Sequence, residues 1–122
     1  MEPNFDAPDY SLHIEKKTLG GALIFHCRGG FSLVNHALLD GIFEQIKATP
    51  ERKVVLDLTG VRFMDSVGVG TIAAILKHAM TTDKNLVVVS NDIVDQNLSS
   101  ANMTQIIRIV RTLDEALGSL AP

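Results

Sequence analysis

Residues 54–71 read VVLDLTGVRFMDSVGVGT, and this stretch decides the fold. It opens with a short apolar run that is typical of a central parallel strand, which we expect over residues 52–58. A loop follows, and a helix is predicted over residues 66–80. That helix carries no charge before Lys77, which predicts that it is largely buried. A buried strand that leads through a loop into a helix indicates an α/β protein.

The flanking sequence repeats this alternation. A Gly-Gly dipeptide at residues 20–21 separates two short period-2 segments, which predicts an antiparallel hairpin. We expect Gly29 and Gly30 to end its second strand. The predicted strands cover residues 11–18, 22–28, 52–58, 86–89 and 106–110. The first predicted helix carries an apolar stripe over residues 38–46 and ends before Pro50, and the other helices cover residues 66–80, 92–101 and 112–120. The order β-β-α-β-α-β-α-β-α predicts an α/β fold with a mixed, mainly parallel sheet and about four helices.

Side chains that cap helices support these boundaries. Ser32 or Asn35 is expected to cap the first helix, and Asp92 the third. Thr112 with Glu115 three residues later forms a capping box at the start of the last helix.

Composition narrows the classes of function. The chain has 122 residues and a net charge of -3, which fits one domain over residues 11–120 after a flexible leader over residues 1–10. There is no basic patch of the kind that binds nucleic acid or anionic membranes. The N-terminus lacks the basic and apolar regions of a signal peptide, so we expect a cytoplasmic protein. Cys27 is the only cysteine, and no metal-ligand spacing or cofactor motif is present.

Ser66 stands out at the start of the predicted helix. A serine there is most often only an N-cap, and its hydroxyl could accept from the amides of Gly68 or Val69. Gly68 and Gly70 each cost a helix about 0.8–1.0 kcal/mol relative to alanine, which favours close approach of a neighbouring element or a partner. We expect a phosphate on Ser66 to find free amides at the helix start. A bulky residue at position 68 is expected to harm partner docking more than folding.

The segment resembles the signature of STAS-domain anti-sigma factor antagonists, a strand followed by Phe-Met-Asp-Ser-x-Gly-x-Gly. The matching residues are Phe63, Met64, Asp65, Ser66, Gly68 and Gly70. The likeness extends over about residues 11–120. It implies that Ser66 is phosphorylated by an anti-sigma factor that is also a GHKL-type serine kinase. The unphosphorylated form would bind that kinase, the phosphorylated form would release it, and a PP2C-type phosphatase would restore the first state. Such an antagonist is not an enzyme.

Two departures from the family pattern concern the partner. Well-known members read Gly-Glu-Leu-Asp where this chain reads Gly29-Gly30-Phe31-Ser32, and they often carry a second serine where this chain has Val67. Ser66 is therefore the sole acceptor in the motif. The residues expected to contact the partner are Met64, Asp65, Ser66, Val67, Gly68, Gly70, Gly30 and Ser32.

Three alternatives remain open at this stage. Asp57 follows a buried strand, as the phosphorylated aspartate of a receiver domain does, although the acidic pair and lysine of a receiver are missing. Four histidines could serve an enzyme, but none has a serine or an acid at a motif spacing. A STAS module can also act as a scaffold or a transport accessory without any switch.

Overall fold

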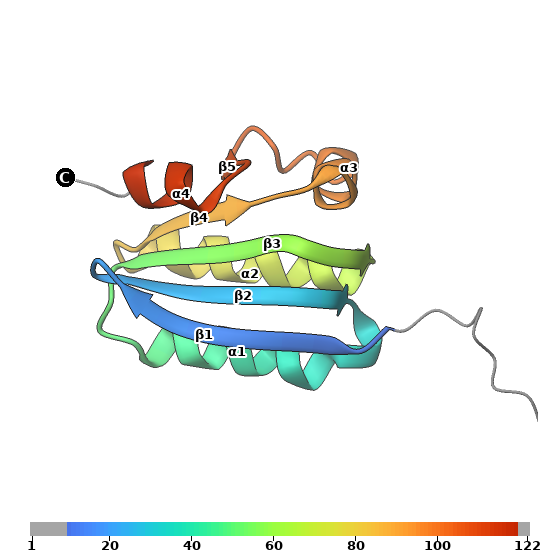
Figure 1. The fold of residues 1–122 in the computed structure, drawn as a ribbon, viewed down its shortest axis with the longest axis horizontal. Coiled ribbons are helices and arrows are strands. Elements are labelled where there is room, and N and C mark those ends of the chain that lie inside the picture. The colour runs from blue at the N-terminus through green and yellow to red at the C-terminus, as the bar shows by residue number, and fades with distance from the viewer. Residues whose placement is uncertain (1–9, 120–122) are drawn as a thin grey trace, which may run out of the picture.

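A mixed five-stranded sheet with helices on both faces forms the structure, a computed structural model that describes residues 10–119 (Figure 1). The strands are β1 (Leu12–Leu19), β2 (Ala22–Phe31), β3 (Lys53–Met64), β4 (Asn85–Val89) and β5 (Arg108–Val110). The helices are η1, a 3-10 turn (Leu33–Asn35), α1 (His36–Ala48), α2 (Ser66–Thr81), α3 (Asp92–Ser100) and α4 (Leu113–Ser119). The predicted leader, apart from Tyr10, lies outside the described residues.

The sheet order is β1-β2-β3-β4-β5, with β1 antiparallel to β2 and every other neighbouring pair parallel. This confirms the predicted α/β class and the hairpin at the sheet edge. The hairpin turn passes through Gly20 and Gly21, both at positive φ, a conformation that glycine adopts without steric cost.

The sheet divides the apolar side chains into two clusters. The larger one packs α1, α2 and α3 against one face of the sheet, and Figure 1 shows α1 and α2 side by side along that face. The smaller one packs α4 against Ala22, Ile24, Val55, Val87 and Val89 on the opposite face. The second face is therefore covered only in part.

β2 and β3 are longer than predicted. Gly29 and Gly30 do not end β2, because the pairing with β3 continues to Phe31 through two register shifts. Gly29 has a φ of +108°, and a Cβ there would lie 1.9 Å from the carbonyl oxygen of Ser11. The glycines thus let the backbone just before β1 lie close beside the end of β2, where the amide of Gly30 donates to the carbonyl of Ser11. β3 likewise runs to Met64, so the predicted loop after Leu58 is strand.

The prediction that α2 is largely buried holds only for the side that faces the core. Its buried residues are Gly68, Ile72, Ile75 and Ala79. Val67, Val69 and Leu76 pack against the same core but are only partly buried. Met80 on the outer face is 73% exposed. The lack of charged residues in the first part of α2 is therefore not a sign that this part is fully buried. Several uncharged residues of the helix are exposed to solvent. No helix within residues 10–119 has the length and apolar character needed to cross a membrane.

Two of the predicted caps need correction. Asn91, not Asp92, caps α3, and its Oδ1 accepts from the amide of Val94 at 2.9 Å. Asn35 precedes α1 without a side-chain cap, because its amide group donates to the carbonyls of Tyr10 and Gly30. Thr112 does act as predicted and accepts from the amide of Glu115 at 3.1 Å.

Cys27 lies in the core of β2, 3% exposed, and burial followed by the charge of Asp57 raises its pKa to about 12. Unfolding would return the thiol to its ordinary range near 8.5. The unfolded chain then binds fewer protons than the native chain between these values, so stability falls as pH rises through that interval. We expect wild type to lose about 1.4 kcal/mol per pH unit more than Cys27→Ala above about pH 9. Urea titrations of both proteins from pH 7 to 10.5 measure this, and parallel slopes would contradict it.

Candidate functional site

Asp65 caps the N-terminus of α2. The sequence had suggested Ser66 for this role, and that prediction is wrong. Asp65 Oδ1 accepts hydrogen bonds from the amides of Val67 at 3.0 Å and Gly68 at 3.1 Å. Its backbone is extended, with φ -130° and ψ -172°, as an N-cap requires. Ser66 is therefore the first residue inside the helix.

The same carboxylate also holds a second element. Asp65 Oδ2 accepts from the backbone amide of Leu33 at 3.0 Å. Leu33 begins η1, which follows β2, and it is 32 residues away from Asp65 in the sequence. One side chain thus ties the end of β2 and the start of α2 together, an arrangement we call the Asp65 clamp (Asp65 with the amides of Leu33, Val67 and Gly68).

Ser66 is exposed beside this clamp. The two nearest first-turn amides, those of Val67 and Gly68, already donate to Asp65. The amide of Val69 donates to the Asp65 carbonyl as the first intrahelical bond. The expectation that a phosphate on Ser66 finds these amides free is therefore wrong, because a phosphate would have to displace the Asp65 carboxylate to reach them.

The structure brings the other seven predicted contact residues to the same end of the sheet, but it buries four of them. Gly70 is exposed and Asp65 and Val67 are half-buried. Met64, Gly68, Gly30 and Ser32 are buried, Ser32 to 1% exposure. The buried members lie beneath the surface that carries Ser66, and their role there is to set its shape.

The two glycines of the motif have different roles. A Cβ on Gly68 would lie 2.1 Å from the carbonyl oxygen of Phe31, whereas a Cβ on Gly70 would meet nothing within 4 Å. Gly68 is thus the point where α2 packs directly on the backbone at the end of β2. Because of this contact, a bulky residue at position 68 should harm folding, which the sequence analysis had expected to be the smaller effect.

Exposed apolar side chains lie at the same end of the sheet as Ser66, and the sequence analysis missed two of them, Leu33 and Val34. Leu33 is 57% and Val34 68% exposed in the turn that Asp65 holds. Phe63, 40% exposed, packs edge-on against Tyr10 with ring centroids 4.8 Å apart. The sequence feature that could have revealed this surface is the apolar pair Leu33-Val34. It precedes a helix whose buried residues begin only at Leu39. We call Leu33, Val34, Ser66 and Gly70 the Ser66 surface.

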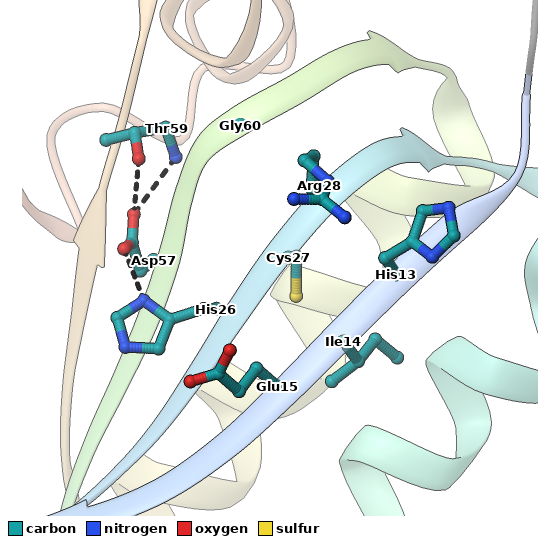
Figure 2. A pocket seen from close by; sticks show the side chains of 9 residues that line it. All are labelled: His13, Ile14, Glu15, His26, Cys27, Arg28, Asp57, Thr59 and Gly60. Carbon is teal, nitrogen blue, oxygen red and sulfur yellow. Dashed lines mark hydrogen bonds and ion pairs between the residues drawn. The ribbon is translucent and has the colours of Figure 1, made fainter.

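Asp57, the residue considered as a receiver-type phosphoacceptor, has structural partners instead. It lies within β3, where its Oδ2 is 2.6 Å from His26 Nδ1 on the neighbouring strand (Figure 2). Its Oδ1 accepts from the amide of Thr59 at 3.1 Å and from the Thr59 hydroxyl at 2.7 Å. The sequence analysis missed the His26 partner, because the two residues are 31 positions apart and meet only through the strand register.

A family model and a relative identify the family of this chain, and solved structures share its fold. The STAS domain model matches residues 13–116 of the chain. An anti-sigma factor antagonist homologue of Thermotoga neapolitana is 31% identical over 83 residues, which cover 67% of this chain and 74% of that protein. The crystal structure of an anti-sigma factor antagonist from Thermotoga maritima superposes with a TM-score of 0.81 at 24% identity, covering 88% of this chain and 93% of that one. The unphosphorylated form of SpoIIAA, another anti-sigma factor antagonist, gives a TM-score of 0.67 at 11% identity, with 88% and 96% covered.

The contrast between the two glycines predicts opposite effects on stability. Gly68→Ala should lower the free energy of unfolding by about 2 kcal/mol or more, because the backbone of α2 must move away from Phe31. Gly70→Ala should raise it by about 0.8–1.0 kcal/mol, because alanine favours a helix and the position is open. Urea unfolding of the two variants measures both values. Equal effects of the same sign would show that Gly68 is not a packing contact.

Proposed function

The chain belongs to the STAS domain family, and on this basis we propose that it acts as an anti-sigma factor antagonist switched by phosphorylation of Ser66. Its partner is an anti-sigma factor that is also a GHKL-type serine kinase. The partner binds the unphosphorylated form at the Ser66 surface, and phosphorylation releases it. A PP2C-type phosphatase restores the binding form.

The observation that carries the proposal is the accessibility of Ser66 at a rigidly held helix start. The hydroxyl lies on an exposed residue directly after the capping Asp65. The Asp65 clamp fixes the turn before α1 and the first turn of α2 relative to each other. A kinase therefore meets a preformed surface and pays little entropy to order it.

Binding of the unphosphorylated form rests on apolar contact. Leu33 and Val34 together expose two large aliphatic side chains beside the capped helix start. Gly70 leaves the helix backbone bare on the exposed side of α2. A partner element can approach the backbone closely there, and the aliphatic pair supplies the burial that makes an interface core.

Release follows from charge. A phosphoserine carries a charge of about -1.5 to -2 at pH 7. On Ser66 this charge would stand beside the Asp65 carboxylate, which already uses both oxygens on three amides. Like-charge repulsion then opposes docking and also weakens the cap, because the two anions compete for the same donors. The phosphoryl group comes from the nucleotide of the partner kinase and is transferred to Ser66 Oγ, so this chain supplies the acceptor and no catalytic group.

The experiment pairs charge variants with a matched control. Ser66→Asp should weaken binding of the cognate anti-sigma factor by at least about tenfold, which corresponds to about 1.4 kcal/mol. Ser66→Ala should bind as wild type does, because Ser66 is not the cap. Ser100→Asp, an exposed serine at the end of α3, should leave binding unchanged. Titration calorimetry measures all three affinities.

Mass spectrometry of the protein from its own cells supplies the complementary observation, a phosphate on Ser66. A phosphate found only at other residues would reject the acceptor assignment. If Ser66→Asp and Ser66→Ala bind equally well and no phosphate is present, the chain is a STAS scaffold or transport accessory without a switch.

A further inference from the structure

The part of the sheet that α4 leaves uncovered carries charged side chains in two neighbouring rows. The strand register places Glu15, His26 and Asp57 side by side across β1, β2 and β3. The next row holds His13 and Arg28, opposite each other, with Gly60 on β3. Between the rows lies a hollow of about 430 Å³, which we call the trough (Figure 2).

The carboxylates of the first row have partners within the protein. Asp57 binds His26 and Thr59. Glu15 pairs with Lys17 at 3.1 Å, and the hydrogen bond and charge of Lys17 lower the pKa of Glu15. This row is therefore internally balanced, and its remaining acceptor capacity faces the trough.

The guanidinium groups at the other end are not balanced in this way. Arg28 and Arg62 line a second hollow of about 230 Å³, which shares His13 and Arg28 with the trough. Neither guanidinium has an ion pair or hydrogen bond to any residue between 10 and 119, in contrast with Arg52 and Arg111, which pair with aspartates. Two like charges close together across strands destabilise a sheet.

Irregular pairing of β2 and β3 produces this cluster. The register shifts occur between His26 and Arg28 and again between Gly29 and Gly30. Such bulges re-aim side chains, and here they bring Arg62 to the same hollow as Arg28. Gly60 opposite Arg28 has no side chain, and a Cβ there would lie 3.2 Å from the Arg28 stem. The floor of the trough is therefore open next to the guanidinium.

We propose that this end of the sheet binds the phosphate group of a small hydroxylated phosphate monoester. Two guanidinium groups match the charge of about -1.5 to -2 on such a group, and their planar N–H donors fit its oxygens in pairs. A carboxylate, with one charge, would leave one arginine unpaired. His13, directly across from Arg28, adds an imidazole donor.

The organic part of the ligand lies along the trough. The carboxylates of Glu15 and Asp57 and the hydroxyl of Thr59 can accept hydrogen bonds from its hydroxyl groups. No Phe, Tyr or Trp side chain from residues 10–119 lines either hollow, so there is no platform on which a nucleotide base would stack. This site lies on the sheet face opposite α2, and it does not depend on the role of Ser66.

NMR titration of the full chain with inorganic phosphate and with glycerol 3-phosphate at constant ionic strength tests the site. Both probes should give saturable amide shifts at residues 11–13, 28–29 and 60–62. Only the ester should also shift residues along the trough, namely Glu15, Asp57 and Thr59, and it should bind more tightly. Arg28→Gln and Arg62→Gln should each weaken binding of the ester by about tenfold or more, because each removes a charge-assisted hydrogen-bond donor. Arg52→Gln, which removes an exposed arginine from the opposite end of β3, is the matched control and should bind as wild type does.

Equal affinities of the Arg28, Arg62 and Arg52 variants for glycerol 3-phosphate would overturn the site. Shifts spread over the whole surface without saturation would do the same, since they indicate only non-specific screening. An ester that binds no more tightly than inorganic phosphate would overturn the assignment of the trough to the organic part. The exposed variants are expected to retain the wild-type spectrum away from the site, which separates lost binding from lost folding.

Discussion

The end of the sheet that carries Ser66 depends on the hydrogen bonds that the carboxylate of Asp65 accepts. This carboxylate caps α2 and also binds the amide of Leu33, so it joins two segments that the crossover topology brings together only at the carboxyl ends of β2 and β3. Without it, two first-turn amides of α2 and the first amide of η1 would lose their acceptor. The position of Ser66 relative to Leu33 and Val34 is therefore set by one side chain.

Close backbone packing at two glycines also helps to hold α2 and the end of β2 in place. Gly68 allows α2 to rest on the carbonyl of Phe31, and Gly30 allows the segment at Tyr10 to lie close beside β2, where a Cβ would come within 2.4 Å of the Tyr10 carbonyl oxygen. These contacts bring three stretches of chain to the Ser66 end without bulky side chains between them. In the switch that we propose, a rigid base of this kind would let a phosphate on Ser66 alter docking instead of being absorbed by local movement.

The fold could be predicted from the sequence because its signals are local. The Gly20-Gly21 turn, the apolar strands and the amphipathic helices each depend on neighbouring residues. The ends of β2 and β3 could not be predicted, because Gly29 and Gly30 are needed for a long-range approach of Ser11 and Tyr10 and do not break the strand. The start of α2 followed the same pattern: a capped helix was predicted there, but Asp65 rather than Ser66 was found to be the cap. The choice between two adjacent capping residues was settled by the distant amide of Leu33, which no local pattern reveals.

Amide hydrogen exchange at Leu33, Val67 and Gly68 tests the role of Asp65 most directly. The account predicts that Asp65→Ala accelerates exchange at all three amides, including Leu33 across the fold, whereas Ser66→Ala leaves their protection unchanged. Unaltered protection of Leu33 in Asp65→Ala, or an equal loss in Ser66→Ala, would contradict it.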